Sequence, residues 1–297
     1  MPRTSRCYSG TRLASIQLTE RDKQIFECIH AFDGVMSLKQ IDQLFFSGAG
    51  GTWARERMRA LVAHDLLRSP KPDEQHKVPR GERVYWLGRE GAKLVAGLRG
   101  DGLQSFTWRK TARWSKLRHD LAVNDFRLTV TKTVATSPTL TLKLWVHEGE
   151  FLANPDTVQY ANRQGKRMKR QVRPDSFFAI QQTRFGGKTS DFAYLLEIDM
   201  ATEHNPRFVR EKVRPGLAYL KSNQYLERFG YRFGRWLVVT TSQRRLENMV
   251  RHAGQAGAQG MFYFTTFAQV TAESAISAPI WTVVGKSEPV CLIPTHS

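Results

Sequence analysis

The chain has 297 residues, 41% hydrophobic and 24% charged, an ordinary globular composition with enough apolar residues for a core. Its 45 lysines and arginines against 27 acidic residues give a net charge of +18, which favours a polyanionic partner, above all nucleic acid. Three scattered cysteines argue against a disulfide framework or a cysteine zinc site. Without a long apolar run or a signal-like start, we expect a cytoplasmic protein with no membrane partner.

The first elements predicted along the chain are short helices. Residues 1–16 are basic and polar, and we expect a flexible arm. A helix follows Thr19, which forms a near-capping box with Asp22 and precedes apolar residues at helical spacing. Ser37 marks the start of a second helix, and the SGAGG run at 47–51 indicates a turn.

A third helix is predicted from Thr52, followed by a two-stranded wing between Leu66 and Leu87 and a closing helix, REGAKLVAGL. Three short helices and a hairpin in this order are typical of a winged helix-turn-helix, which we place at residues 17–98. In that architecture the third helix enters the DNA major groove.

The third helix carries an arginine-rich face. Arg55 and Arg59 are one helical turn apart, with Arg57 and Trp53 nearby. Arginine binds guanine through two hydrogen bonds or holds a phosphate. We therefore predict that these four residues contact DNA. The alternative is a solvated basic face on a winged helix that binds protein.

After a Gly-rich, basic linker at 99–114, a second domain is predicted over residues 115–297. It begins with a helix from Ser115 to about Ala135 that carries His119, Asp120 and Asp125. The other predicted elements are the strand TLTLKLWV, the strands DSFFAI and FAYLLEID, a helix from about Pro206 to Leu226, the strand RWLVVTT, a helix at 243–255, and the strands MFYFTTF and IWTVV. This order predicts a mixed sheet flanked by helices, and an α+β class for the whole chain.

Acidic residues gather at the ends of two of these strands. Asp175 starts one, whereas Glu197 and Asp199 end the other, on one face because side chains alternate along a strand. Glu203 follows at the entrance to a helix. If the strands are neighbours, the carboxylates converge, and oxygen ligands favour Mg²⁺ or Mn²⁺, which can activate water against a phosphate. The alternative is strand-end acids without a metal, with Glu203 favoured there by the helix N-terminus.

A loop dense in positive charge precedes the first of these acids, and we expect it to hold the DNA backbone. Its cations are Arg163, Lys166, Arg167, Lys169, Arg170 and Arg173. Other chemistry is not supported: the histidines form no HxH or HExxH pattern, and neither a GxxxxGK[ST] nor a GxSxG motif occurs.

The segments HDLAVNDFRL (119–128), RPDSFFAI (173–180) and LLEIDMATE (195–203), with the helix carrying Lys212 and Tyr219, resemble the replication-relaxation family of plasmids and integrative elements. The family is similar to MobC-type relaxases. The resemblance implies a winged helix joined to a PD-(D/E)xK, or restriction-endonuclease-like, domain. It further implies double-stranded DNA at an origin as partner, other relaxosome or replication proteins, and strand nicking. Asp175 and Glu197 match the metal-binding acids.

One position departs from the nuclease motif. Asp199 stands where the motif has its lysine, and Lys212 on the next helix is the candidate to replace it. Asp175, Glu197, Asp199 and Lys212 are therefore the candidate catalytic residues, the three acids being the candidate metal ligands. Two functions stay open: a metal-dependent nickase of a mobile element, and a non-enzymatic DNA-binding regulator or replication accessory factor with an inactive nuclease fold.

Overall fold

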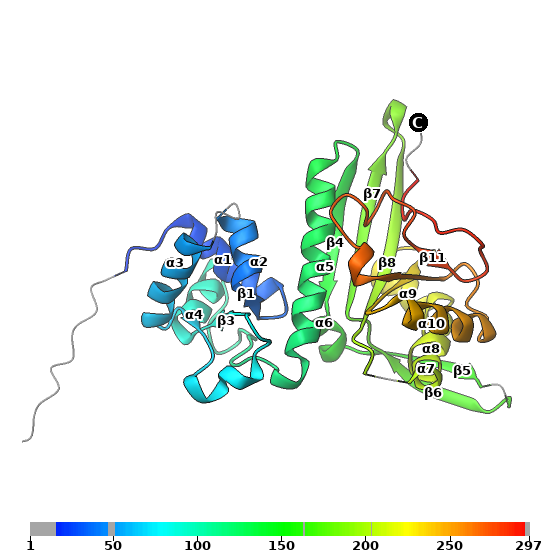
Figure 1. The fold of residues 1–297 in the computed structure, drawn as a ribbon, viewed down its shortest axis with the longest axis horizontal. Coiled ribbons are helices and arrows are strands. Elements are labelled where there is room, and N and C mark those ends of the chain that lie inside the picture. The colour runs from blue at the N-terminus through cyan, green and yellow to red at the C-terminus, as the bar shows by residue number, and fades with distance from the viewer. Residues whose placement is uncertain (1–15, 47–50, 163, 203, 295–297) are drawn as a thin grey trace, which may run out of the picture. The chain divides into compact units, whose positions relative to one another are not determined.

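The computed structural model describes residues 16–46, 51–162, 164–202 and 204–294 (Figure 1). The chain divides into two compact units, Met1–Leu117 and Arg118–Ser297, which we call unit 1 and unit 2. Helices and sheets occur in both units, so the predicted α+β class is confirmed. Nearly all of the predicted arm and of the turn at 47–51 lies outside the described residues. In the ranges described, no helix is long and apolar enough to cross a membrane.

Unit 1 has the element order of a winged helix-turn-helix. Its three short strands form one antiparallel sheet in the order β1-β3-β2. The elements are α1 (Glu20–Ala31), β1 (Met36–Ser37), α2 (Leu38–Phe45), α3 (Thr52–Ala63), β2 (Leu67–Arg68), η1 (Pro72–Lys77), β3 (Val84–Leu87), α4 (Arg89–Leu98) and η2 (Trp114–Lys116). The wing is therefore β2 and β3 with the η1 turn between them, and β1 is a third strand that the sequence pattern did not predict.

Local capping explains where the first two helices begin. Thr19 and Asp22 form the expected capping box at α1, and Ser37 with Gln40 forms another at α2. The segment expected to be a linker packs onto unit 1. Phe106 is buried there, and the indole of Trp86 donates a hydrogen bond to the carbonyl of Lys110, 3.1 Å away.

Unit 2 is built on a six-stranded mixed sheet in the order β11-β10-β9-β8-β7-β4. The elements are α5 (Leu117–Thr136), β4 (Leu140–His147), α6 (Glu148–Ala153), β5 (Asp156–Ala161), β6 (Arg167–Val172), β7 (Ser176–Thr183), η3 (Phe185–Gly187), β8 (Thr189–Asp199), α7 (Asn205–Phe208), the π-helix η4 (Val209–Val213), α8 (Arg214–Leu220), α9 (Asn223–Phe229), β9 (Arg235–Thr240), α10 (Gln243–Gln255), β10 (Phe262–Thr266), η5 (Phe267–Gln269) and β11 (Thr282–Val283). Neighbours β8, β9 and β10 run parallel, and the remaining pairs are antiparallel.

The two faces of this sheet are covered by different helices (Figure 1). On one face, alternate strand residues such as Phe177 and Leu195 pack against the helices α7 to α10. On the other face, Phe178 and Tyr194 pack against Phe126 of α5 and the C-terminal segment. Because both faces are buried, the central strands are apolar throughout, and polar side chains lie at strand ends.

Two predicted elements of unit 2 differ from the structure. The basic loop is largely an antiparallel hairpin of β5 and β6, because Val158 and Val172 alternate with its polar residues and join the core. The single helix expected from Pro206 to Leu226 is four helical segments. Its last break follows from Ser222, whose side chain accepts a hydrogen bond from the backbone of Tyr225 and caps α9.

Candidate functional site

The pairing of β7 with β8 brings two of the predicted acids together. The strands are antiparallel with Ser176 opposite Leu196, and the backbone NH of Asp175 donates to the carbonyl of Leu196 at 2.9 Å. Asp175 therefore lies across from Glu197 at the end of the strand pair. Both side chains are buried, at 5% and 9% exposure. The short Gly-rich connection thus joins neighbouring strands, the condition on which their convergence depended.

Asp175 is held by contacts with the helix α5 and with the neighbouring strand β8. One carboxylate oxygen, Oδ2, lies 3.0 Å from Nε2 of His119 in the first turn of α5. The same oxygen accepts a hydrogen bond from the backbone NH of Ile198 at 2.6 Å. The other ring nitrogen of His119, Nδ1, lies 3.6 Å from Oδ1 of Asp120. Asp175 is therefore fixed by a strand on one side and a helix on the other.

Glu197 contacts Lys212, the candidate lysine of the sequence analysis. Nζ of Lys212 lies 2.7 Å from Oε2 of Glu197 and 3.3 Å from the carbonyl oxygen of Arg173. Lys212 lies in the π-helix η4. Such wider helical turns are rare in proteins as a whole, but those that occur are frequently found at functional sites. His119, Asp175, Glu197 and Lys212 form what we call the acid cluster.

The cluster is electrostatically strained at Glu197. Burial raises the pKa of Glu197 to about 8, because Lys212 only partly offsets it and Asp175 adds repulsion. Burial disfavours the charged imidazole, yet the attraction of Asp175 outweighs it and raises the pKa of His119 to about 10. Burial likewise opposes ionisation of Asp175, but His119 outweighs it and lowers the pKa of that carboxyl. These shifts favour an ion pair between His119 and Asp175 and oppose ionisation of Glu197.

Asp199 does not join the cluster. Its Oδ2 accepts hydrogen bonds from Thr240 at 2.6 Å and from Nε of Arg245 at 2.9 Å, and its Oδ1 accepts from the same guanidinium at 2.9 Å. This two-pronged contact with α10 uses the carboxylate structurally, so the three predicted acids are not one ligand set. In the part of the chain described, no group of three or more His, Cys, Asp or Glu side chains is placed to hold a metal. Glu203 lies outside the described residues.

His119 is the cluster residue that the sequence analysis did not assign to the site. A histidine in a helix more than fifty residues before Asp175 has no fixed spacing to it in the chain. The available signal was the HD pair at the start of a helix, within a segment that carried the family resemblance. The contact arises because α5 covers one sheet face and its first turn lies beside Asp175, which directly precedes β7.

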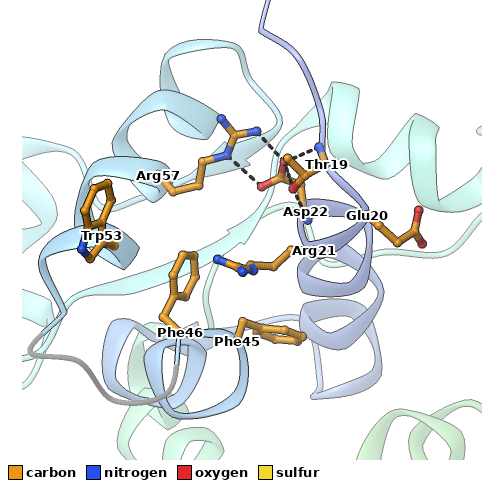
Figure 2. Close-up of a pocket in the computed structure, with 8 residues that line it drawn as sticks. All are labelled: Thr19, Glu20, Arg21, Asp22, Phe45, Phe46, Trp53 and Arg57. Carbon is orange, nitrogen blue, oxygen red and sulfur yellow. Dashed lines mark hydrogen bonds and ion pairs between the residues drawn. The ribbon is translucent and has the colours of Figure 1, made fainter.

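The structure separates the residues predicted to bind DNA on α3 into exposed side chains and one that is held by another helix. Arg55 and Arg59 are exposed, and neither has an ion pair with another described residue. Trp53 is 73% exposed. Arg57 differs: its Nε donates to Asp22 at 2.9 Å, and its Nη2 donates to the same carboxylate and to the carbonyl of Gln17 at 2.8 Å (Figure 2). Arg57 therefore ties α3 to α1.

The predicted cations before Asp175 differ in exposure, because side chains alternate between the two faces of β6. Lys166, Arg167, Lys169 and Arg173 are exposed, whereas Arg170 is half-buried on the inner side of β6. Arg163 lies outside the described residues. The exposed cations form a basic stripe on the β5–β6 hairpin.

The fold and these features define a basic α+β protein with a helix-turn-helix unit and a sheet unit carrying buried paired acids. The family model for replication-relaxation proteins matches residues 31–228, two thirds of the chain, including every member of the acid cluster. The chain belongs to the replication-relaxation family. Membership supports a function connected with replication or mobilisation. Comparison with curated proteins and with solved structures gave no match.

Proposed function

We propose that this protein binds double-stranded DNA at a replication or transfer origin of a mobile element, with α3 as its reader. The observation that carries the proposal is the exposed pair Arg55 and Arg59, one turn apart on the third helix of a winged helix-turn-helix and without counter-ions among the described residues. Arginines at these positions have the reach and the donor geometry for guanine edges and phosphates in the major groove.

The basic stripe on the β5–β6 hairpin supports the same partner. Phosphate contacts position a protein on DNA without reading its sequence, and they make affinity fall steeply with salt. A net charge of +18 supplies the long-range attraction. If the protein acts at such an origin, we expect other relaxosome or replication proteins among its partners.

The test is replacement of the two arginines. Arg55→Ala with Arg59→Ala should weaken binding to the cognate origin by about 1–3 kcal/mol per lost base contact. The matched control is Arg89→Ala with Arg99→Ala, which removes two exposed arginines, the first residue of α4 and the residue that follows its end. Equal affinities for wild type and the Arg55/Arg59 variant would exclude α3 as the reader.

A second candidate function is metal-dependent nicking of that DNA, favoured by the convergence of Asp175, Glu197 and Lys212 in a PD-(D/E)xK-like order. Two buried carboxylates fit Mg²⁺ or Mn²⁺, since such ions are held by one or two carboxylates together with water and substrate phosphate. The raised pKa of Glu197 fits the same interpretation, because a cation would replace its proton. A bound ion would polarise the scissile phosphate and activate water.

The chain's own residues have separate roles in this candidate. Asp175 and Glu197 are the proposed ligands, and His119 orients Asp175 through the 3.0 Å contact. Lys212, which contacts Glu197, is the proposed substitute for the missing motif lysine and would stabilise charge on the phosphate. Asp199, engaged by Arg245, has no role in the chemistry.

Nicking of supercoiled plasmid tests this second function. Activity should require Mg²⁺ or Mn²⁺, disappear with EDTA or Asp175→Asn, and fall with Lys212→Ala, while EDTA-resistant origin binding persists. A wild-type protein that binds the origin and never nicks it with either ion would instead be a DNA-binding regulator or accessory factor with an inactive nuclease fold.

A further inference from the structure

Unit 1 contains a hollow beside the start of the proposed reading helix α3. It lies between the start of α1, the end of α2 and the start of α3 and has a volume of about 670 Å³ (Figure 2). This volume is within the usual range of small-ligand sites, roughly 300–1,000 Å³. Three aromatic side chains line it: Phe45, Phe46 and Trp53.

The aromatic lining presents ring surface to solvent. Trp53, in the first turn of α3, is 73% exposed, whereas tryptophan side chains are highly buried on average. The guanidinium of Arg21 lies over the ring of Phe46, 4.9 Å from its centroid. Trp53 and Phe46 come from different helices, and both line the open space (Figure 2).

The floor of the hollow is fixed. Asp22 accepts from Nε of Arg57 at 2.9 Å and from the backbone NH and hydroxyl of Thr19 at 2.7 and 2.8 Å. Burial opposes ionisation of Asp22, but Arg57 and Thr19 outweigh it and lower the pKa of this carboxyl. The aromatic residues are thus mounted on a preformed base, which reduces the ordering cost of binding a ligand.

The hollow is lined by two acids and two arginines, and the carboxylates are engaged by cations other than Arg21. The carboxylate of Asp22 is neutralised by Arg57, and that of Glu20 lies 3.1 Å from Nζ of Lys23. Arg21, by contrast, has no carboxylate partner within the described ranges. A flat aromatic surface beside an uncompensated guanidinium matches a nucleotide, whose base offers a ring face and whose phosphate is an anion.

We propose that this hollow binds an unpaired nucleobase of the DNA, stacked on Trp53 with an adjoining phosphate beside Arg21. The inference rests on the proposed DNA binding by α3, because Trp53 precedes Arg55 by two residues on that helix. Paired bases inside a duplex offer only their edges, so the hollow distinguishes flipped or single-stranded bases from paired ones.

The experiment uses the full chain and an origin duplex with one unpaired 2-aminopurine, whose fluorescence falls when it stacks on an aromatic ring. Wild type should quench the probe and bind this DNA more tightly than the fully paired duplex. Trp53→Ala should abolish the quenching and weaken binding to the unpaired probe roughly tenfold more than it weakens binding to the paired duplex. Trp53→Phe, which keeps a ring, should retain most of both effects.

Phe185→Ala is the matched control, since it removes another exposed aromatic residue, from unit 2, and should leave quenching unchanged. Equal losses on paired and unpaired DNA in Trp53→Ala would overturn the proposal, as would quenching that survives this substitution. If α3 does not read the duplex, the result is different. Replacing Arg55 and Arg59 would then leave origin affinity unchanged, while Trp53→Ala would still affect the unpaired probe.

Discussion

His119 and Asp175 form a buried ion pair whose contribution to stability should vary with pH. Because the pKa of His119 is raised from 6.5 to about 10, its stabilisation is complete below pH 6.5 and is lost as the pH rises through 10. Replacing His119 with Asn removes this contribution and leaves Asp175 without its charged partner. We therefore expect His119→Asn to have a lower free energy of unfolding than wild type near pH 6.5.

The gap between the two proteins should close as the pH approaches 10. Urea unfolding in EDTA at several pH values between 6 and 10 measures it, and His252→Asn on α10 controls for loss of a histidine elsewhere in unit 2. A gap of constant size across this range would mean that His119 acts through packing or a neutral hydrogen bond.

Arg245 and Asp199 form a second buried pair, with side-chain exposures of 15% and 8%. Removing one partner leaves an uncompensated charge in the interior. Arg245→Ala should therefore lower the free energy of unfolding by about 3–5 kcal/mol. Arg244→Ala, at the exposed neighbouring position, is the control and should change it by less than about 0.5 kcal/mol. Equal stabilities of the two variants would contradict the structural role given to Asp199.

The same pair predicts the result of rebuilding the nuclease motif. Asp199→Lys restores the motif lysine in sequence, but it places a second cation against Arg245 and removes the acceptor used by Thr240. We expect a destabilised protein with no gain in nicking, measured by thermal unfolding and by the plasmid assay. A stable variant with increased nicking would show that position 199, and not Lys212, is the effective lysine position.

In the β5–β6 hairpin, strand alternation decides which of the predicted DNA-binding cations are exposed. Neutralising the exposed Lys166, Arg167 and Lys169 together should weaken binding to all DNA sequences alike. It should also flatten the plot of log affinity against log salt by roughly 0.9 for each lost duplex contact. The measurement is fluorescence anisotropy with cognate and unrelated duplexes over a range of salt concentrations.

The matched control neutralises three exposed cations elsewhere in unit 2, namely Arg244, Arg251 and Lys286. It changes net charge equally, so it separates hairpin contacts from general attraction. If the two triple variants have the same slope of log affinity against log salt, the hairpin makes no specific phosphate contacts.

Elements with a strong local signal were predictable from the sequence. α1 and α2 start where a capping side chain satisfies free backbone NH groups, a pattern confined to four residues. The hairpin was predicted as a loop because its arginines and lysines mask the alternation of Val158 and Val172, whose burial depends on helices far along the chain. Strand propensity depends on such tertiary packing more than helix capping does.

The acid cluster was predictable in part for the same reason. Asp175 and Glu197 lie on strands joined by a short turn, so their approach follows from the sequence once the strands pair. His119 reaches Asp175 from α5, and Arg245 of α10 holds Asp199 away from the acid cluster. Both contacts join segments separated by more than 40 residues, and periodicity does not report them.

The residues proposed to read the DNA sequence and those proposed to bind phosphate lie in different units. Arg55 and Arg59 belong to unit 1, the basic stripe belongs to unit 2, and the two groups share no side-chain partner among the described residues. Free-energy effects of substitutions without shared partners usually add to within about 0.3–0.5 kcal/mol. A variant that combines the Arg55/Arg59 and hairpin substitutions should therefore lose the sum of the two separate losses on cognate DNA.

Unrelated DNA should respond differently, because it offers phosphates and no cognate bases. There the hairpin substitutions alone should account for most of the loss, and the Arg55/Arg59 substitutions should add only their smaller phosphate component. Anisotropy titrations of wild type, both parents and the combination on both DNAs complete this cycle. A combined loss on cognate DNA well below the sum would mean that the two groups compete for the same DNA contacts, because each would then matter only while the other is intact.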